Sequence, residues 1–170
     1  MAQFYRVNSF LSDLAKGSHN FDADIFWLVL SPEGGEPGNA NLSIDDLPQF
    51  GFPVQDPVLA ANNLEGSSHA NWWSKIIPNV NLVETPFGAT GNNVKLSVVA
   101  DKVTFKAVNG KVGPFRYYFM VNAKGTPHFR TVCYWDIGSP ITLQDGDEFT
   151  VKFSAQDLQG TVLRLEPPEA

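Results

Sequence analysis

The three histidines and the single cysteine are the side chains best suited to acid–base, metal or nucleophilic chemistry. His19, His69 and His128 lie far apart in the sequence, so no two of them have the three- or four-residue spacing of a local metal-binding pair. Cys133 lies within the apolar run Val132–Trp135, which favours a buried thiol over a reactive one. We therefore expect neither a metal ion nor a cofactor.

The acidic segments are also poor candidates for a cation site. Asp145–Glu148 reads Asp-Gly-Asp-Glu but lacks the alternating oxygen donors and the distal Glu of a calcium-binding loop, so a hairpin turn is favoured. No Gly-x-Ser-x-Gly elbow and no phosphate-binding glycine loop is present. A triad could still form from distant residues. Nothing points to one, and we expect that the chain is not an enzyme, a small hydrolase being the disfavoured alternative.

The adjacent pair Trp72 and Trp73 is the strongest candidate for a recognition surface. Neighbouring residues point in different directions on a strand or a helix, so both rings rarely bury together. Large aromatic groups in a polar loop can stack on a sugar or anchor a protein interface. The alternative is a loop whose aromatic side chains fix it to the core.

Composition indicates a folded, β-rich chain. Of the 170 residues, 43% are hydrophobic and 12% aromatic, and the 12 Pro and 14 Gly are spread along the sequence, which favours short strands joined by turns. This length suits one domain, 1–170. The net charge of −6 comes without a Lys/Arg cluster, so we expect no nucleic-acid partner. The apolar run Ile25–Leu30 is too short to span a bilayer, and no signal core precedes it. We expect no membrane partner and synthesis in the cytoplasm.

Apolar spacing of three and four residues predicts a helix over 4–16, ended by Gly17. Phe21–Leu30 is expected to be a strand that enters the core. A long irregular insertion is predicted over about 32–92, with one helical turn at Ser43–Leu47. Within it, the apolar segment Asn71–Ile77 is compatible with either a helix or a short strand.

Period-two alternation after position 93 predicts a series of strands. Turns are expected at Asn109-Gly110, at Lys124-Gly125 and at Asp145–Asp147, and Gly138-Ser-Pro140 is expected to end a strand. The expected strands are Asn93–Val98, Lys102–Ala107, Phe115–Asn122, Phe129–Trp135, Phe149–Phe153 and Val162–Leu165, with a short element at Ile141–Leu143. This pattern predicts a mainly β fold, an antiparallel β-sandwich or jelly-roll-like barrel with a short N-terminal helix.

Two sets of motifs resemble a family of small bacteriophage structural proteins of the capsid-decorating type. The N-terminal set is Phe10-Leu-x-Asp-Leu-Ala-Lys-Gly-Ser-His-Asn-Phe21 followed by Asp24-Ile-Phe-Trp-Leu-Val-Leu-Ser31. The C-terminal set is Val112-Gly-Pro-Phe-Arg-Tyr117, Tyr134-Trp-Asp-Ile-Gly-Ser139 and Leu143-Gln-Asp-Gly-Asp-Glu-Phe-Thr-Val151. The match covers about half of the chain, in order, and leaves the middle, 32–92, unmatched.

The resemblance implies a virion structural protein, with capsid decoration (cement) as the favoured role. The partners would be the major capsid protein and copies of the chain itself, by analogy a trimer, on the capsid surface of the virion. We expect the contacts to involve Phe4 and Tyr5 together with the Trp72–Trp73 loop. The alternative is a tail, neck or fibre component with a receptor- or glycan-binding role.

Overall fold

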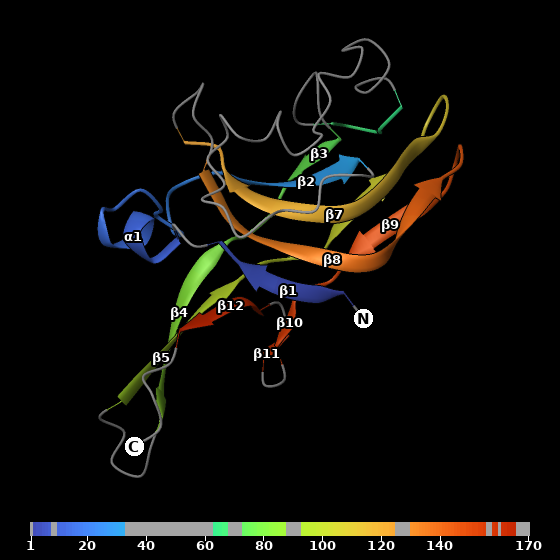
Figure 1. Cartoon of the computed structure of the whole chain (residues 1–170). Helices are drawn as coiled ribbons and strands as arrows, with labels where there is room; N and C mark the ends of the chain where they lie inside the picture. Colours follow the sequence, from blue (N-terminus) through green and yellow to red (C-terminus); the bar gives the residue numbers. More distant parts are fainter. Residues whose placement is uncertain are drawn as a thin grey trace.

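The computed structural model describes residues 2–7, 10–32, 63–67, 73–87, 93–124, 130–155, 158–159 and 161–165 (Figure 1). The Trp72 side chain, the Ser43–Leu47 turn, His69 and His128 fall outside these ranges. The elements are β1 (Gln3–Arg6), α1 (Phe10–Ala15), β2 (Phe26–Pro32), β3 (Ser74–Ile76), β4 (Asn81–Phe87), β5 (Asn93–Val99), β6 (Val103–Lys106), β7 (Val112–Asn122), β8 (Arg130–Leu143), β9 (Glu148–Val151), β10 (Ser154–Ala155), β11 (Leu158–Gln159) and β12 (Thr161–Leu165).

A five-stranded antiparallel sheet in the order β1-β8-β7-β2-β3 organises the fold. The two long central strands come from the most apolar, aromatic-rich part of the sequence, as expected for strands buried on both faces. Leu28 and Val29 are neighbours on opposite faces of β2, and both are fully buried. Both faces of the sheet are therefore covered at this point of β2.

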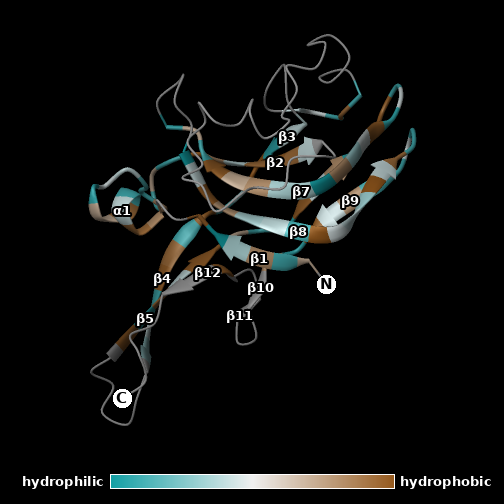
Figure 2. Cartoon of the chain, viewed as in Figure 1, coloured by the Kyte–Doolittle hydropathy of each residue, from teal (hydrophilic) through white to brown (hydrophobic). Residues whose placement is uncertain are grey.

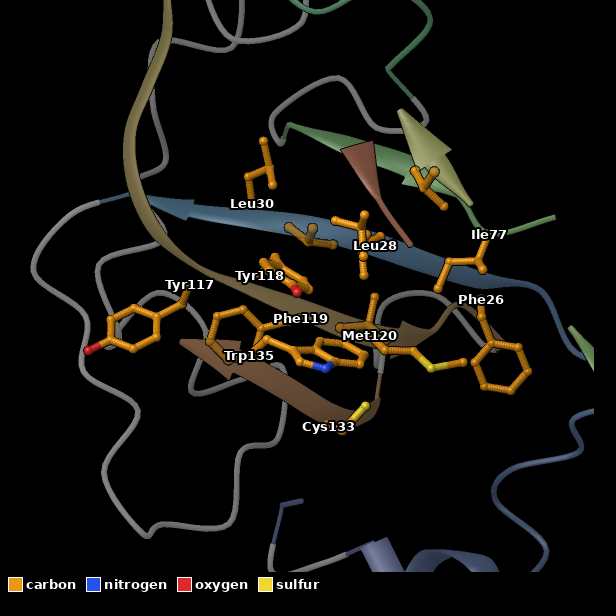
Figure 3. Packing of buried hydrophobic residues seen from close by; sticks show 14 of the residues in the cluster. Phe26, Leu28, Leu30, Ile77, Tyr117, Tyr118, Phe119, Met120, Cys133 and Trp135 are labelled. Atoms are coloured by element: carbon orange, nitrogen blue, oxygen red, sulfur yellow. The ribbon is translucent and has the colours of Figure 1, made fainter. Parts of the chain in front are cut away.

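One face of this sheet carries most of the core. Leu28 pairs with Met120, which in turn pairs with Cys133, so these three side chains form a row across three strands. The Tyr118 and Trp135 rings stack beside this row with centroids 5.0 Å apart. Figure 3 shows this group packed together, with the Tyr117 ring directed away from it.

A second layer covers that face. It includes the two-stranded sheet β6-β9, and the three-stranded sheet β12-β5-β4 contributes Val98 and Val162 to the same core. From β9, Phe149 meets Tyr118 and Phe115 edge-on, at centroid distances of 5.9 and 5.3 Å. The layers form a β-sandwich-like arrangement, which confirms the predicted class; the strands do not close into a barrel within the described residues.

The N-terminal region differs from its prediction. A helix does form, at Phe10–Ala15, and Gly17 follows it with a positive φ of 69°. Residues 4–6, however, belong to β1 and pair with β8, Phe4 opposite Trp135 and Tyr5 opposite Tyr134. The prediction of one helix over 4–16 was wrong there because pairing with a distant strand outweighs the local apolar spacing.

Three further segments also differ from their predictions. Phe21–Asp24 forms turns, and the strand begins at Phe26. The chain does not break at Gly138-Ser-Pro140: β8 continues to Leu143, with Gly138 at a φ of 95° and irregular register nearby. The insertion predicted over 32–92 is not irregular throughout, since it contains β3 and β4, and the segment before Ile77 forms a short strand and not a helix.

Candidate interface

β1 places two of the predicted interface residues at one edge of the central sheet. The Phe4 side chain is 40% exposed, and its ring meets Trp135 edge-on at 5.6 Å. Tyr5 is half-buried and stacks on Tyr134, with centroids 4.9 Å apart and planes within 9°. Both rings are held by cross-strand contacts, so they form a fixed aromatic edge that still offers surface to a partner.

Of the other predicted pair, Trp72 and Trp73, the structure describes only Trp73. Trp73 is only 6% exposed, and its carbonyl oxygen accepts a hydrogen bond from the backbone N–H of Leu30 at 2.9 Å. For this residue the structure agrees with the alternative, a segment fixed to the core by its aromatic ring. Trp72 lies outside the described residues. The interface prediction therefore rests on Phe4 and Tyr5.

A second apolar surface lies at the opposite edge of the same sheet, and sequence analysis missed it. Ile25 and Ile76 are 57% and 54% exposed. Ile76 pairs with Trp27, and the backbone N–H of Ala123 donates to the Ile25 carbonyl at 2.8 Å. Alternation places Ile25, Trp27, Ile76 and Ala123 on one face; we call these four residues the β2–β3 patch. No sequence signal marked it, because Ile25 begins an apolar run that otherwise enters the core.

The β4–β5 hairpin is a third exposed element. In Figure 1 it points away from the five-stranded sheet, and Figure 2 shows apolar residues in it. Val94 is 42% exposed and Pro86 is exposed. Exposed apolar groups gathered at strand edges are more typical of contact surfaces than of isolated chains.

Residues of the quoted motifs come together inside the fold. The Arg116 guanidinium donates two hydrogen bonds to the Asp136 carboxylate, at 2.8 and 2.7 Å, and also lies 5.1 Å from the Tyr117 ring centroid. The backbone N–H of Gly138 donates to the same carboxylate at 2.7 Å. The segments Gly-Pro-Phe-Arg-Tyr and Trp-Asp-x-Gly therefore form one ion-paired unit on β7 and β8.

The N-terminal motif forms a polar junction with the ends of β7 and β8. We call it the His19 junction; its members are Asp13, His19, Asp24, Asn122, Lys124 and Arg130. Asp24 accepts hydrogen bonds from the Asn122 amide and the Asn20 backbone, both at 2.8 Å. The Lys124 ammonium lies 3.1 Å from the other Asp24 oxygen. Burial alone would raise the pKa of Asp24, but these hydrogen bonds and this cation outweigh it and lower the pKa.

Other reactive groups lie buried. Cys133 is fully buried, and this burial raises the pKa of its thiol well above the ordinary value. The described residues hold no group of three or more His, Cys, Asp or Glu side chains that could bind a metal ion.

Asp145–Asp147 forms the expected turn, with Gly146 at a φ of 88°. No helix in the described part of the chain is long and apolar enough to cross a membrane.

Comparisons with protein-family models, with curated proteins and with solved structures gave no match. The resemblance of the motifs to phage structural proteins stays a prediction.

Proposed function

We propose that the chain is a structural protein of a bacteriophage virion and, more specifically, a capsid decoration protein that binds the major capsid protein and stabilises the head. The observation that carries the proposal is the pair of apolar edges on one rigid sheet. β1 offers Phe4, and the β2–β3 patch at the far edge offers Ile25 and Ile76. A subunit that must bind neighbours on two sides needs such a pair of surfaces.

The interior supports the same role. The aromatic contacts between Tyr118, Trp135 and Phe149 tie the two layers together, so the exposed edges are held in fixed positions before binding. Pre-organised surfaces lose little conformational entropy on association. A rigid subunit with apolar edges suits attachment to a repeating shell, where identical contacts recur around symmetry axes.

A tail, neck or fibre component is the second candidate. The observation that favours it is the half-exposed, stacked pair of Tyr5 and Tyr134 beside the Arg116–Asp136 ion pair. Aromatic faces next to fixed polar groups are a common setting for sugar recognition. The copy number per particle distinguishes the two roles, since a decoration protein covers the shell and a fibre component is present in few copies.

Purified phage particles test the proposal directly. Quantitative mass spectrometry should find the chain in numbers comparable to the major capsid protein, and a density map should place it on the head surface. A low copy number with density at the tail would favour the second candidate. Absence of the chain from purified particles would reject both.

Binding of the purified chain to particles that lack it tests the surfaces themselves. The double variant Ile25→Ser/Ile76→Ser should bind about tenfold or more weakly, because two apolar side chains no longer gain burial energy. Leu11→Ser is the matched control, since Leu11 is 50% exposed on α1, outside both edges. Equal binding of the patch variant and the control would show that the β2–β3 patch is not part of the interface.

A further inference from the structure

His19 is a buried titratable side chain at the point where the N-terminal segment meets the sheet. It is only 4% exposed, and its ring packs against those of Phe10 and Phe21 at centroid distances of 5.9 and 6.2 Å. Burial lowers its pKa from the ordinary 6.5; the Asp13 and Asp24 carboxylates oppose this shift and Arg130 reinforces it. The imidazole is therefore neutral at pH 7.

The neighbouring amide determines which ring nitrogen carries the proton. The Asn122 Oδ1 accepts the backbone N–H of Lys124 at 2.8 Å, and its Nδ2 donates to the Ser18 carbonyl at 3.1 Å and to Asp24 at 2.8 Å. These three bonds fix the amide so that its NH₂ group faces the His19 Nδ1 at 3.3 Å. Nδ1 is therefore the unprotonated nitrogen, and the proton is on Nε2.

A second proton cannot be accommodated in this arrangement. An Nδ1–H would face the Asn122 NH₂, donor against donor. Nε2 is buried and has no hydrogen-bond partner among the described residues. The imidazolium would thus be buried with neither N–H satisfied, which is costly.

The nearby carboxylates are already engaged with other cations. Asp13 accepts a hydrogen bond from the Arg130 guanidinium at 2.7 Å, and Asp24 pairs with Lys124 at 3.1 Å. Each carboxylate is thus already partly neutralised by a cation, which weakens its attraction for a new imidazolium. Protonation of His19 therefore favours opening of the junction.

The junction links segments that are distant in the sequence. Asp13 lies in α1 while Arg130 begins β8, and Asn122 ends β7. The bonds from Asn122 to Ser18 and Asp24 hold the connecting turns against the sheet. Opening would release α1 and residues 18–24 from the sheet and leave the aromatic layer contacts in place.

We propose that the His19 junction is an acid-sensitive latch: uptake of one proton by His19 breaks the Asn122 bonds and releases α1 with residues 18–24 from the central sheet. The latch is closed when His19 is neutral. It opens as the pH falls below 6.5, the ordinary histidine value, while side-chain carboxylates, with ordinary values near 4, remain charged. This property belongs to the chain itself and does not depend on a virion role.

Hydrogen exchange followed by NMR, between pH 7.5 and 5, tests the latch. The reporters are the backbone N–H groups of Ser18 and Asp24, which bond to Asp13 and Asn20 carbonyls at 2.8 Å. After correction for intrinsic exchange, their opening constant should rise up to about tenfold per pH unit below 6.5, because the open form binds one more proton. Ala107, whose N–H bonds to the Asp147 carbonyl at 3.0 Å, should show no such rise.

The variant His19→Phe separates the latch from general acid sensitivity. Phenylalanine keeps an aromatic ring packed against Phe10 and Phe21 but cannot be protonated, so the pH dependence at Ser18 and Asp24 should disappear. If this variant does not fold, titration of the His19 Cε1–H in the wild-type chain supplies the answer. The proposal is overturned if His19 titrates at or above 6.5, or if Ser18 and Ala107 respond to pH alike.

Discussion

Arg116 and Asp136 are the charged residues that most firmly join the two central strands. The hydrogen bonds from Arg116 are the main reason that the pKa of Asp136 is lowered; burial opposes the shift, and the backbone N–H of Gly138 adds to it. Because the native pKa lies below the ordinary 3.8, Asp136 stabilises the fold above that value and loses its contribution as the pH falls below it.

Replacement of Arg116 by lysine should lower the free energy of unfolding by about 0.5–1 kcal/mol at pH 7, since lysine cannot form the paired bonds and solvent screens a side chain that is 37% exposed. Urea unfolding measures this loss, which should shrink as the pH falls below 3.8, because Asp136 takes up a proton more readily in the unfolded chain. Lys106→Ala is the control: its 4.0 Å contact with Glu65 is exposed and should contribute little. A loss that is the same at pH 3 and pH 7 would contradict the ion-pair account.

At the scale of elements, the β7–β8 ladder depends on a close backbone approach at Gly113. This residue has a φ of 118°, and a Cβ atom there would lie 2.7 Å from the Ile141 carbonyl oxygen and 3.0 Å from the Thr142 Cα. The facing atoms are backbone, so they cannot move aside as a flexible side chain would. Glycine is required here for space as well as for conformation.

Gly113→Ala should therefore cost about 2–3 kcal/mol of unfolding free energy. Gly138→Ala is the matched control, because Gly138 has a φ of 95° but nothing within 4 Å of the position of a Cβ. It should cost about 1 kcal/mol, from backbone strain alone. Thermal and urea unfolding of both variants give the comparison, and equal losses would mean that the close approach is unimportant.

Elements formed by local patterning could be predicted from the sequence, and those formed by distant pairing could not. The alternation around Val94 and Phe105 gave β5 and β6 nearly at their observed bounds. β1 was missed because Phe4 fits a helical spacing equally well, and only its partner Trp135 decides the outcome. Pro140 suggested a strand end, yet β8 continues through it to Leu143, beyond the residues Cys133–Asp136 that pair with β1.

The residues of the candidate interface also divide into those that could be predicted from the sequence and those that could not. Phe4 could be found because an exposed aromatic residue near a terminus stands out in the sequence. Ile25 could not, because its neighbours Phe26 and Leu28 are buried and nothing in the apolar run distinguishes it from them. Exposure at a sheet edge is a property of the assembled strands.

For the whole molecule, the burial of Cys133 gives a measure of global opening. The thiol belongs to the row formed with Leu28 and Met120 and has no exposed surface, and its pKa is raised by burial. As the chain contains one cysteine, labelling by a thiol reagent reports on this site alone. In native buffer the labelling rate should be more than about 1,000-fold below that of the urea-unfolded chain. Rapid labelling without denaturant would show that the two layers separate readily.

The place of β1 in the sheet has a consequence for the order of events during synthesis. Its partner residues Cys133–Asp136 are made roughly 130 residues after Gln3, so β1 must wait for a strand that is distant in the sequence. Until that strand exists, Phe4 and Tyr5 have no residues to pair with. Contacts so distant in the sequence slow folding, so we expect this edge of the sheet to form late.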